Sequence, residues 1–292
     1  MAFESWQLGD IRITKIPEQD RIPGMKALLP DASPAAVAAI PWLRPHFVNE
    51  QGKLLASIHA FVVETPERYL LVDTCVGNDK PRSYAGWDRM QGPFLAMLEA
   101  GGYPAELIDT VLCTHMHVDH VGWNTRWLDG RWVPTFTNAR YLFSRVEYQH
   151  WQAESQEGAS EDGMDPGTVL ADSVQPILDA GLADFVDAPF DVCPGVRLLP
   201  TPGHTPGHVS VELTSNGHSA LITGDLMHHP CQIARPNWAA SADEDQDQAR
   251  LTRNAVLERS AGNGELLLGS HFATPTAGRI VRDGDSYRLV LE

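Results

Sequence analysis

The chain has 292 residues, of which 43% are hydrophobic and 21% are charged, and its formal net charge at pH 7 is −16. This composition is typical of a soluble globular protein that is long enough to bury a large core. The acidic balance and the lack of basic runs argue against nucleic-acid binding, because phosphate contacts need clustered Lys and Arg. The same charge disfavours anionic membranes and highly anionic substrates.

The N-terminal residues have no basic region followed by an apolar segment, so we expect no signal peptide. No stretch approaches 18 consecutive apolar residues, so we also expect no transmembrane helix. The four cysteines are far apart and form no CxxC pair; they are Cys75, Cys113, Cys193 and Cys231. A chain of this length does not need disulfides, and a reducing cytoplasmic location is the simplest expectation.

The N-terminal part begins with an alternating apolar and polar pattern over Ile11 to Ile16, which predicts a half-buried strand. Prolines are frequent over residues 17–57, and they predict a segment with no more than a short helix over 35–40. Its apolar side chains, Trp42 and Phe47 among them, argue against disorder. The segment is either a lid or binding wall, or an arm that wraps over the core or against a second subunit in a homodimer.

The rest of the chain alternates predicted strands and helices. Strands are expected over 58–64, 69–73, 108–113, 140–144, 196–199, 209–213, 219–223 and 266–268, with a closing hairpin of 279–281 and 287–291. Helices are expected over 94–100, 146–152, 169–178 and from the acidic run at 243–247 to about Ser260. We interpret the acidic run as a solvated helix start, and residues 156–167 as an exposed loop. We find no short repeat or linker, so one domain over 1–292 is expected.

The most informative stretch is THMHVDHVG at 114–122, which places three histidines and an aspartate within six residues directly after a buried strand. Imidazole nitrogen and carboxylate oxygen suit zinc and its first-row neighbours. In a strand, His115, His117 and Asp119 would share one face while His120 took the other. A loop can instead divide the four ligands between two adjacent ions. The alternative is a polar turn with solvated histidines.

Further candidate ligands lie at the ends of other predicted strands. His204 and His208 belong to a Pro- and Gly-rich loop, TPGHTPGH, while Asp225 and His271 directly follow strands. Asp73 ends an earlier strand in the same way. Each of these residues alone is more often hydrogen-bonded structure than a ligand, but together with the histidine-rich loop they strongly indicate a metal site.

The set H-x-H-x-D-H, with a strand-end Asp before it and His, Asp and His after it, resembles the metallo-β-lactamase superfamily from residue 58 to 271. The resemblance implies an α+β four-layer αβ/βα sandwich, in which two mixed β-sheets are flanked by helices and the metals lie at one edge. It implies two Zn²⁺ ions, with manganese, cobalt or iron as alternatives.

The resemblance also implies a role for each matching residue. The first metal would be held by His115, His117 and His204, the second by Asp119, His120 and His271, and Asp225 would bridge the two. Asp73 would support the ligand loop without binding metal, and His208 would be structural.

Departures from the family pattern narrow the function. The family usually has Gly where this chain has Cys75, so the loop after Asp73 is expected to differ in detail. β-Lactamases of the superfamily have Cys or Ser near the position of Asp225, and flavodiiron members have Glu at the position of His117. Nuclease members carry extra RNA-binding parts, and the acidic charge of this chain argues against them. Glyoxalase II members append a helical domain, whereas the residues after His271 are predicted to be strands. The chain therefore resembles the lactonases, arylesterases and organophosphate hydrolases.

We accordingly expect a binuclear zinc-dependent hydrolase that cleaves a neutral ester or lactone, such as an N-acyl homoserine lactone or an aryl ester. A metal-bridging hydroxide would attack the carbonyl, and Asp119 or Asp225 would pass a proton to the leaving alkoxide. The alternatives are an organophosphate triester hydrolase on the same site, an iron redox protein and a metal-dependent binding protein.

Side chains near the ligand segments or on the proline-rich segment are candidates for the wall of a small-molecule pocket. These residues are Trp42, Phe47, Trp123, Trp151, Met227, His228 and His229. Alternatively, the aromatic residues belong to the ordinary core, and His228 and His229 are surface histidines.

Overall fold

The computed structural model describes residues 3–157 and 166–291, and the chain folds into two compact units. Unit 1 comprises residues 1–18 and 58–187, and unit 2 comprises residues 19–57 and 188–292. The expected single domain over 1–292 depends on how these units associate, and it stays a prediction.

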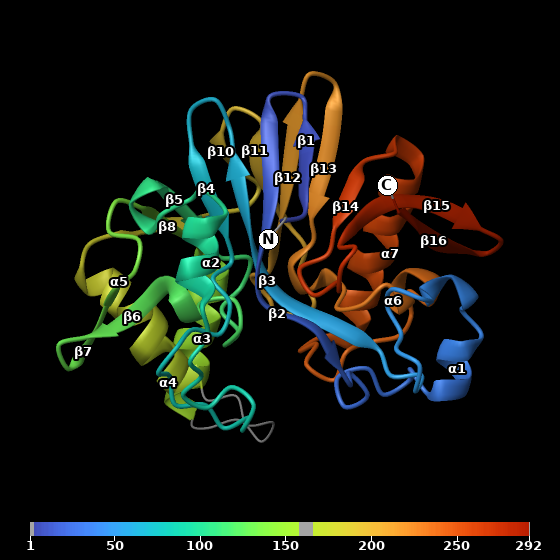
Figure 1. Cartoon of the computed structure of the whole chain (residues 1–292), viewed down its shortest axis with the longest axis horizontal. Coiled ribbons are helices and arrows are strands. Elements are labelled where there is room, and N and C mark those ends of the chain that lie inside the picture. The colour runs from blue at the N-terminus through green and yellow to red at the C-terminus, as the bar shows by residue number, and fades with distance from the viewer. Residues whose placement is uncertain (1–2, 158–165, 292) are drawn as a thin grey trace. The chain divides into compact units, whose positions relative to one another are not determined.

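The first sheet contains seven strands in the order β1-β2-β3-β4-β5-β8-β9 (Figure 1). The strands are β1 (Ser5–Leu8), β2 (Ile11–Pro23), β3 (Leu55–Glu64), β4 (Tyr69–Val72), β5 (Thr110–Leu112), β8 (Arg140–Ser144) and β9 (Ala183–Val186). The β1–β2 and β3–β4 pairs are antiparallel, whereas β4, β5, β8 and β9 run parallel to one another. The parallel strands are short, and β4 and β5 are almost fully buried, as is typical of parallel sheets.

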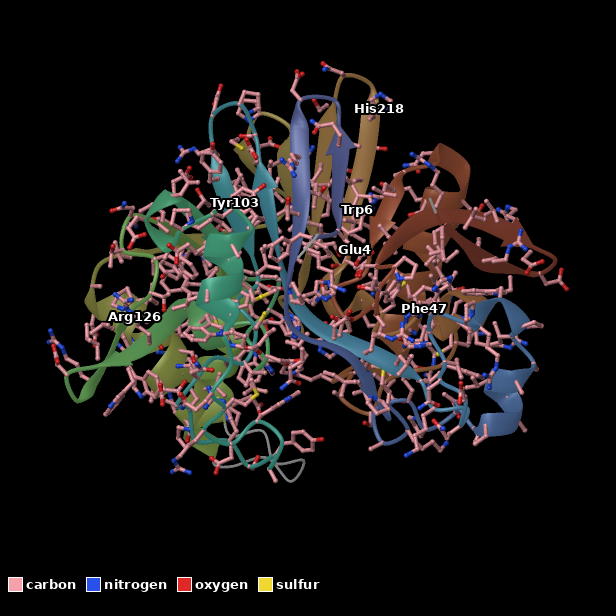
Figure 2. The ribbon with its side chains drawn as sticks, in the orientation of Figure 1. Glu4, Trp6, Phe47, Tyr103, Arg126 and His218 are labelled. Carbon is pink, nitrogen blue, oxygen red and sulfur yellow. The ribbon has the colours of Figure 1, made fainter. Side chains whose placement is uncertain are left out.

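The other elements between residues 58 and 187 belong to unit 1. The strands β6 (Thr125–Leu128) and β7 (Arg131–Pro134) form a separate hairpin. The helices are α2 (Phe94–Ala100), α3 (Arg145–Glu157), α4 (Pro166–Val169) and α5 (Gln175–Asp179), with a π-helical segment η4 (Leu170–Val174) and 3₁₀ turns η2 (Ala105–Leu107) and η3 (Gly122–Asn124). Tyr103, which Figure 2 labels, packs into the core, and its hydroxyl lies 3.1 Å from Oγ1 of Thr14.

The second sheet lies in unit 2 and has the order β10-β11-β12-β13-β14-β15-β16. Its strands are β10 (Phe190–Cys193), β11 (Val196–Pro200), β12 (Val209–Ser215), β13 (His218–Ile222), β14 (Leu266–Leu268), β15 (Ala277–Asp283) and β16 (Ser286–Leu291). Only the β13–β14 pair is parallel. Both sheets are therefore mixed, as expected.

Helices pack on the second sheet, with α7 (Gln246–Asn263) against β15 and α6 (Cys231–Ala234) against β16 (Figure 1). The remaining elements of unit 2 are α1 (Pro34–Ala38) and the 3₁₀ turns η1 (Pro41–Leu43) and η5 (Gly224–Leu226). Among the described residues, none of the helices is both long and apolar enough to span a bilayer.

The proline-rich segment packs into the core of unit 2. Leu29, Leu43 and Phe47 are buried in the same apolar cluster as Met227 and Phe272. Burial of this much apolar surface fixes the segment on the unit, since each buried Leu or Phe side chain contributes about 1.5–3 kcal/mol. Its role as a lid or as a contact with a second subunit stays a prediction.

The expected boundary at Ile16 was wrong, because β2 continues through Pro17 to Pro23. The N–H of Lys15 donates to the carbonyl of Glu4, and the nitrogen of Pro17 has the same direction two residues later. At that point β1 has ended, so a residue without an N–H loses no bond of the β1–β2 ladder. Proline is therefore compatible with this strand.

The helix expected over 169–178 is a run of three segments, α4, η4 and α5. Pro176 has no N–H to donate to the carbonyl of Asp172, four residues earlier. That carbonyl instead accepts from Nζ of Lys80 at 3.2 Å and from Oγ1 of Thr125. Within the π-helical segment, the N–H of Gln175 donates to the carbonyl of Leu170, five residues earlier. Of the exposed loop expected over 156–167, residues 158–165 lie outside the described residues, and the flanking residues belong to α3 and α4.

Candidate metal centre

The histidine-rich loop of unit 1 directly follows β5, as predicted. His115, His117 and His120 are buried. Nε2 of His115 lies 3.0 Å from Nδ1 of His117, and the rings of His115 and His120 have centroids 4.0 Å apart. Nε2 of His120 lies 3.8 Å from Oδ1 of Asp119, whose side chain is 12% exposed. The loop thus places four potential ligands close together inside unit 1.

Asp73 fixes this loop from the end of the neighbouring strand. Because β4 and β5 are parallel with Val72 opposite Leu112, Asp73 and Thr114 follow at the same edge of the sheet. Oδ1 of Asp73 accepts from the N–H of Thr114 at 2.8 Å, and Oδ2 accepts from Oγ1 of Thr114 at 3.0 Å. Nδ1 of His120 lies 2.9 Å from the same Oδ2. Asp73 therefore sets the orientation of the His120 ring, as a supporting carboxylate does.

The segment after Asp73 is held by Glu18, a residue that was not among the predicted site residues. Its carboxylate accepts from the N–H groups of Val76 and Gly77 at 3.0 and 3.1 Å and from Nε1 of Trp123 at 2.7 Å. Burial raises the pKa of Glu18, these three hydrogen bonds oppose the rise, and the charge of Asp119 adds to it. Glu18 occurs in a long mixed strand, so no local sequence pattern identifies it.

Cys75 and Gly122 meet within unit 1 where the backbone is most crowded. Cys75 has a φ of 53°, the left-handed conformation that glycine adopts most easily. The loop after Asp73 thus places a cysteine in a backbone conformation that is usually occupied by glycine. The N–H of Gly122 donates to the carbonyl of Cys75 at 2.7 Å, and a Cβ at residue 122 would lie 1.9 Å from the carbonyl oxygen of Val76. The close approach thus requires glycine at 122.

Three strands of unit 2 end at one edge and present the other candidate ligands. β11 and β13 both pair antiparallel with β12 and so run in the same direction, and β14 is parallel to β13. His204, Asp225 and His271 follow these three strands in turn. Nε2 of His204 lies 3.3 Å from Oδ2 of Asp225, and Nε2 of His271 lies 3.0 Å from Oδ1. Asp225 is thus the point on which the unit 2 ligands converge.

His228 is a third histidine at this carboxylate. Its Nε2 lies 3.2 Å from Oδ2 of Asp225, and its ring stacks on that of His271 at an interplanar angle of 4°. Burial lowers the pKa of His228 even though Asp225 favours the charged form. His229 is also buried, with Nε2 2.9 Å from the carbonyl of Phe47, and burial lowers its pKa to about 4. The alternative that His228 and His229 are surface histidines was therefore wrong.

Asp243 corrects the interpretation of the acidic run, because its side chain is fully buried. Oδ1 of Asp243 lies 2.9 Å from Nδ1 of His204. The other three acids of the run are exposed, and Asp245 caps α7 by accepting from the N–H of Gln248 at 2.9 Å. Burial opposes charge on His204, but its hydrogen bonds with Asp225 and Asp243 outweigh burial and raise its pKa to about 9.

His208 lies among hydrogen bonds to the surrounding polypeptide. Its Nδ1 is 2.9 Å from Oγ1 of Thr201, and its Nε2 accepts from the N–H of Asp225 at 2.9 Å. His208 therefore connects the TPGHTPGH loop to the segment that carries Asp225. This geometry agrees with the structural role that we expect for it.

The candidate pocket residues fall into different environments. In unit 1, the ring of Trp151 meets that of His117 edge-on at 5.2 Å, and its Nε1 donates to Glu147. Trp123 stacks on Phe94 and is part of the core of that unit. In unit 2, Phe47 and Met227 are buried in the apolar cluster, and Trp42 packs against it half-buried. Figure 2 labels Phe47 within this unit.

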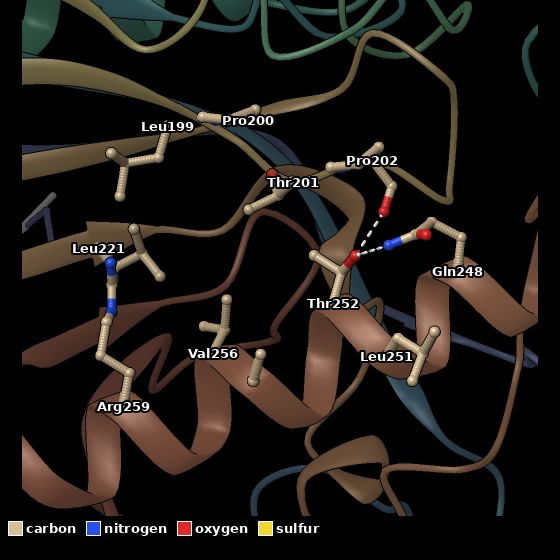
Figure 3. A pocket seen from close by; sticks show the side chains of 11 residues that line it. Leu199, Pro200, Thr201, Pro202, Leu221, Gln248, Leu251, Thr252, Val256 and Arg259 are labelled. Atoms are coloured by element: carbon tan, nitrogen blue, oxygen red, sulfur yellow. Dashed lines mark hydrogen bonds between the residues drawn. The ribbon is translucent and has the colours of Figure 1, made fainter.

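A pocket of about 510 Å³ lies on unit 2 between α7 and the end of β11 (Figure 3). Its lining is largely apolar and includes Leu199, Leu221, Leu251 and Val256. Oγ1 of Thr252, another lining residue, donates to the carbonyl of Pro202 at 2.7 Å. The residues that line this pocket include none of the candidate ligands.

The residues of unit 2 fit a divalent cation. Three imidazole nitrogens lie 3.0–3.3 Å from the oxygens of one buried carboxylate. Nitrogen and oxygen donors of this kind suit zinc and its neighbours. Because Nδ1 of His204 faces Asp243, its Nε2 is the atom left for a cation. The carboxylates of Asp225 and Asp243, which raise the pKa of His204, favour positive charge at this position. A proton provides that charge when no metal is bound.

Comparisons with known proteins bear on this site. Residues 55–271 match the family model of the Metallo-beta-lactamase superfamily. The N-acyl homoserine lactonase AiiA of Bacillus thuringiensis subsp. kurstaki is 27% identical over 191 residues, which cover 61% of this chain and 67% of the lactonase. The crystal structure of hydrolase AbOPH in the beta lactamase superfamily has a TM-score of 0.81 and 28% identity, and covers 99% of this chain and 97% of that one.

A third similar structure is AidC, described as a dizinc quorum-quenching lactonase in complex with a product. It has a TM-score of 0.78 and 23% identity, and the match covers 100% of this chain and 97% of that chain. At this level of identity the likeness concerns the fold.

Proposed function

This chain belongs to the metallo-β-lactamase superfamily, and from that membership we propose that it is a zinc-dependent lactonase. It has the superfamily fold, with mixed β-sheets and flanking helices, so the expected fold class is confirmed. It is a metal-dependent hydrolase that acts on ester or lactone bonds. The proposal concerns the ligands, the metal and the substrate.

We assign the metal ligands as the family pattern implies. The first zinc would be held by His115, His117 and His204, the second by Asp119, His120 and His271, and Asp225, which falls in the first of these two groups of residues, would be the shared ligand that the family pattern implies. The observation that carries the proposal is the convergence of imidazole nitrogens on the buried carboxylate of Asp225. Such a cluster is costly to bury unless a cation balances it.

Two bound ions supply Lewis acidity and a hydroxide nucleophile at neutral pH. The chain's own residues orient the ligands and move protons. Asp73 and Asp243 hold the rings of His120 and His204, and the burial of all four side chains keeps bulk water from these contacts. As the ester C–O bond breaks, Asp119 or Asp225 would take the proton of the hydroxyl group that has added to the carbonyl carbon and pass it to the leaving alkoxide, which leaves a carboxylate and an alcohol. The side chain of Asp119 is more exposed than that of Asp225, at 12% against 5%, which favours Asp119 for exchange with solvent.

We propose a neutral lactone, of the N-acyl homoserine lactone class, as the substrate. The named curated relative is an N-acyl homoserine lactonase, and AidC is a lactonase with the same fold. A neutral substrate also suits a chain with a net charge of −16. Aryl esters and organophosphate triesters are the competing substrates, because the same carbonyl or phosphoryl polarisation serves all three.

The test compares N-hexanoyl homoserine lactone, phenyl acetate and a paraoxon-like triester as substrates of the zinc-loaded chain. We expect the highest kcat/KM for the lactone, and loss of the activity in Asp225→Ala under the same conditions. A higher kcat/KM for the triester or for the aryl ester would overturn the lactone assignment. Metal analysis of the purified protein checks the zinc assignment, and predominant iron would contradict it.

A further inference from the structure

Asp243 is a buried carboxylate placed on the imidazole of His204. Its Oδ1 lies 2.9 Å from Nδ1 of His204, and its Oδ2 accepts from the N–H of Ala240 at 2.8 Å. Both atoms of the carboxylate are thus engaged, and the side chain has no exposed surface. The position of Asp243 is fixed from its own loop as well as from the histidine.

The contact decides which nitrogen of His204 can bind a metal. A neutral imidazole carries one N–H, and the hydrogen bond of one nitrogen fixes the state of the other. With Nδ1–H donating to Asp243, Nε2 is the nitrogen whose lone pair a metal would take, and it lies 3.3 Å from Oδ2 of Asp225. Asp243 therefore selects the tautomer and the ring orientation that a metal ligand needs.

A buried arginine holds the other side of Asp243. Arg253 on α7 is fully buried, and one of its terminal nitrogens lies 3.5 Å from Oδ2 of Asp243. Its Nε donates to the carbonyl of Leu226, the residue after Asp225, at 2.9 Å, and its other terminal nitrogen donates to the carbonyls of Pro236 and Trp238 at 2.9 Å. One guanidinium thus supports both Asp243 and the segment that carries Asp225.

Helix capping does not account for the burial of Asp243. The cap of α7 is Asp245, two residues later, whose side chain accepts from Gln248. A capping residue is exposed at the helix start, as Asp245 is, whereas Asp243 points into the interior. The contacts of its carboxylate are with His204, Arg253 and the N–H of Ala240.

We propose that Asp243 is a positioning residue for the metal centre, an inference that rests on the ligand role of His204 in the proposed function. It holds His204 with Nε2 directed at the metal position, and Arg253 keeps Asp243 in place. A carboxylate on the second nitrogen also raises the basicity of the ligand, which strengthens metal binding.

The experiment measures zinc affinity by competition with a chromophoric chelator in four full-length forms. These are the parent, Asp243→Asn, His204→Ala and the double variant. Asparagine keeps the volume of aspartate but lacks the charge. We expect Asp243→Asn to weaken zinc binding about 10–100-fold, as substitutions of such supporting residues do. In the His204→Ala background the same change should have little further effect, because Asp243 acts through that ring.

Two further measurements separate this role from a general effect on folding. Asp247→Asn changes an exposed acid of α7 and should leave zinc affinity unchanged. Cobalt-loaded Asp243→Asn should show an altered visible spectrum relative to the cobalt-loaded parent, since a tilted imidazole changes the ligand field. Equal loss of affinity with and without His204, or parent-like affinity in Asp243→Asn, would overturn the proposal. Failure to hydrolyse lactones would instead count against the proposed substrate, since zinc affinity is measured without substrate.

Discussion

The two units present their candidate ligands in different ways. Unit 1 places them on one short loop after β5, where the ligands are neighbours in the sequence and Asp73 fixes the loop backbone. Unit 2 collects them from the ends of three strands, and they meet at a single carboxylate, Asp225. The loop depends on local backbone support, whereas the convergent set depends on the sheet and on one shared residue. Substitutions in the two units should therefore differ in how they affect zinc binding, activity and the free energy of unfolding.

The largest expected effect is that of Asp225→Ala. Because Asp225 is the common partner of three histidines, its loss should lower kcat/KM by about a thousandfold or more, which corresponds to roughly 4 kcal/mol of lost stabilisation. Zinc content should fall in parallel. Asp119→Ala removes a proposed ligand that is more exposed than Asp225 and lies 3.8 Å from Nε2 of His120, and it should cost less. The measurement is steady-state hydrolysis with metal analysis of each variant, and full zinc with full hydrolysis in Asp225→Ala would contradict the bridging assignment.

The next largest effect is expected for alanine at two glycines, one in each unit, where the backbone lies against neighbouring backbone. In Gly122→Ala the new Cβ would lie 1.9 Å from the carbonyl oxygen of Val76, and in Gly203→Ala it would lie 2.3 Å from the nitrogen of Ala249. We expect each to lower the free energy of unfolding by about 3 kcal/mol, measured by denaturant titration. Gly262→Ala is the control, because it lies on α7 with open space around it and should be neutral or stabilising by up to about 1 kcal/mol.

Asp73→Asn probes the support of the unit 1 loop. The amide cannot accept from the N–H and hydroxyl of Thr114 and from His120 together, so the ring of His120 should lose its fixed orientation. We expect zinc affinity to fall about 10–100-fold, as for Asp243→Asn. Unfolding of the metal-free protein should show a larger loss of stability for Asp73→Asn, because Asp73 holds the backbone of the ligand loop at Thr114, whereas the backbone contact of Asp243 is with Ala240 in its own loop. Equal losses would mean that the two carboxylates are equivalent supports.

The last prediction is a pH dependence of stability that comes from Lys80 in unit 1. Burial lowers the pKa of Lys80 from 10.5 to about 7, although its ion pair with Asp172 opposes the shift. Between about pH 7 and 10.5 the unfolded chain binds more protons at this residue, so its contribution to the free energy of unfolding rises with pH and is lowest below pH 7.

Lys80→Met should remove this rise, as measured by denaturant unfolding at several values between about pH 7 and 10. Asp172 keeps its ion pair with Arg82 at 2.7 Å, so the variant retains a charged partner for the buried carboxylate. Lys53→Met alters an exposed lysine and serves as the control, with a pH dependence like that of the parent. A Lys80→Met profile that parallels the parent would show that Lys80 does not cause the rise.

The sequence predicted those elements that are marked by periodic apolar residues, by a turn residue or by closely spaced histidines. The strand before His115, the helix over 94–100 and the hairpin around Gly284 were predicted because burial, helical spacing or a turn residue marks each locally. The histidine-rich loop was evident because three histidines and an aspartate occur within six residues. The turns at Gly9-Asp10 and Asp129-Gly130 are local signals of the same kind, and the β1–β2 and β6–β7 hairpins that they mark were missed. The strand β9 lacks such a turn, and its parallel pairing with β8 depends on a partner that the local sequence does not reveal.

Asp243 and Glu18 show why part of the site was not predicted. Asp243 stands among four acids, three of which are solvated, and only the fold shows which one meets His204. Glu18 lies in a strand whose extent was underestimated because of Pro17. In both cases the deciding partner is more than 35 residues away in the sequence. Long-range hydrogen bonds of buried carboxylates leave no local pattern.

The bond between His229 and Phe47 has a consequence for how this protein can vary. Nε2 of His229 donates to the main-chain carbonyl of Phe47, and Nδ1 of His229 accepts from the N–H of Cys231. Every amino acid offers the same carbonyl, so this hydrogen bond constrains the identity of residue 229 and not that of residue 47. The side chain of Phe47 is constrained separately, by its burial in the apolar cluster, so the two ends of one attachment are under different restrictions.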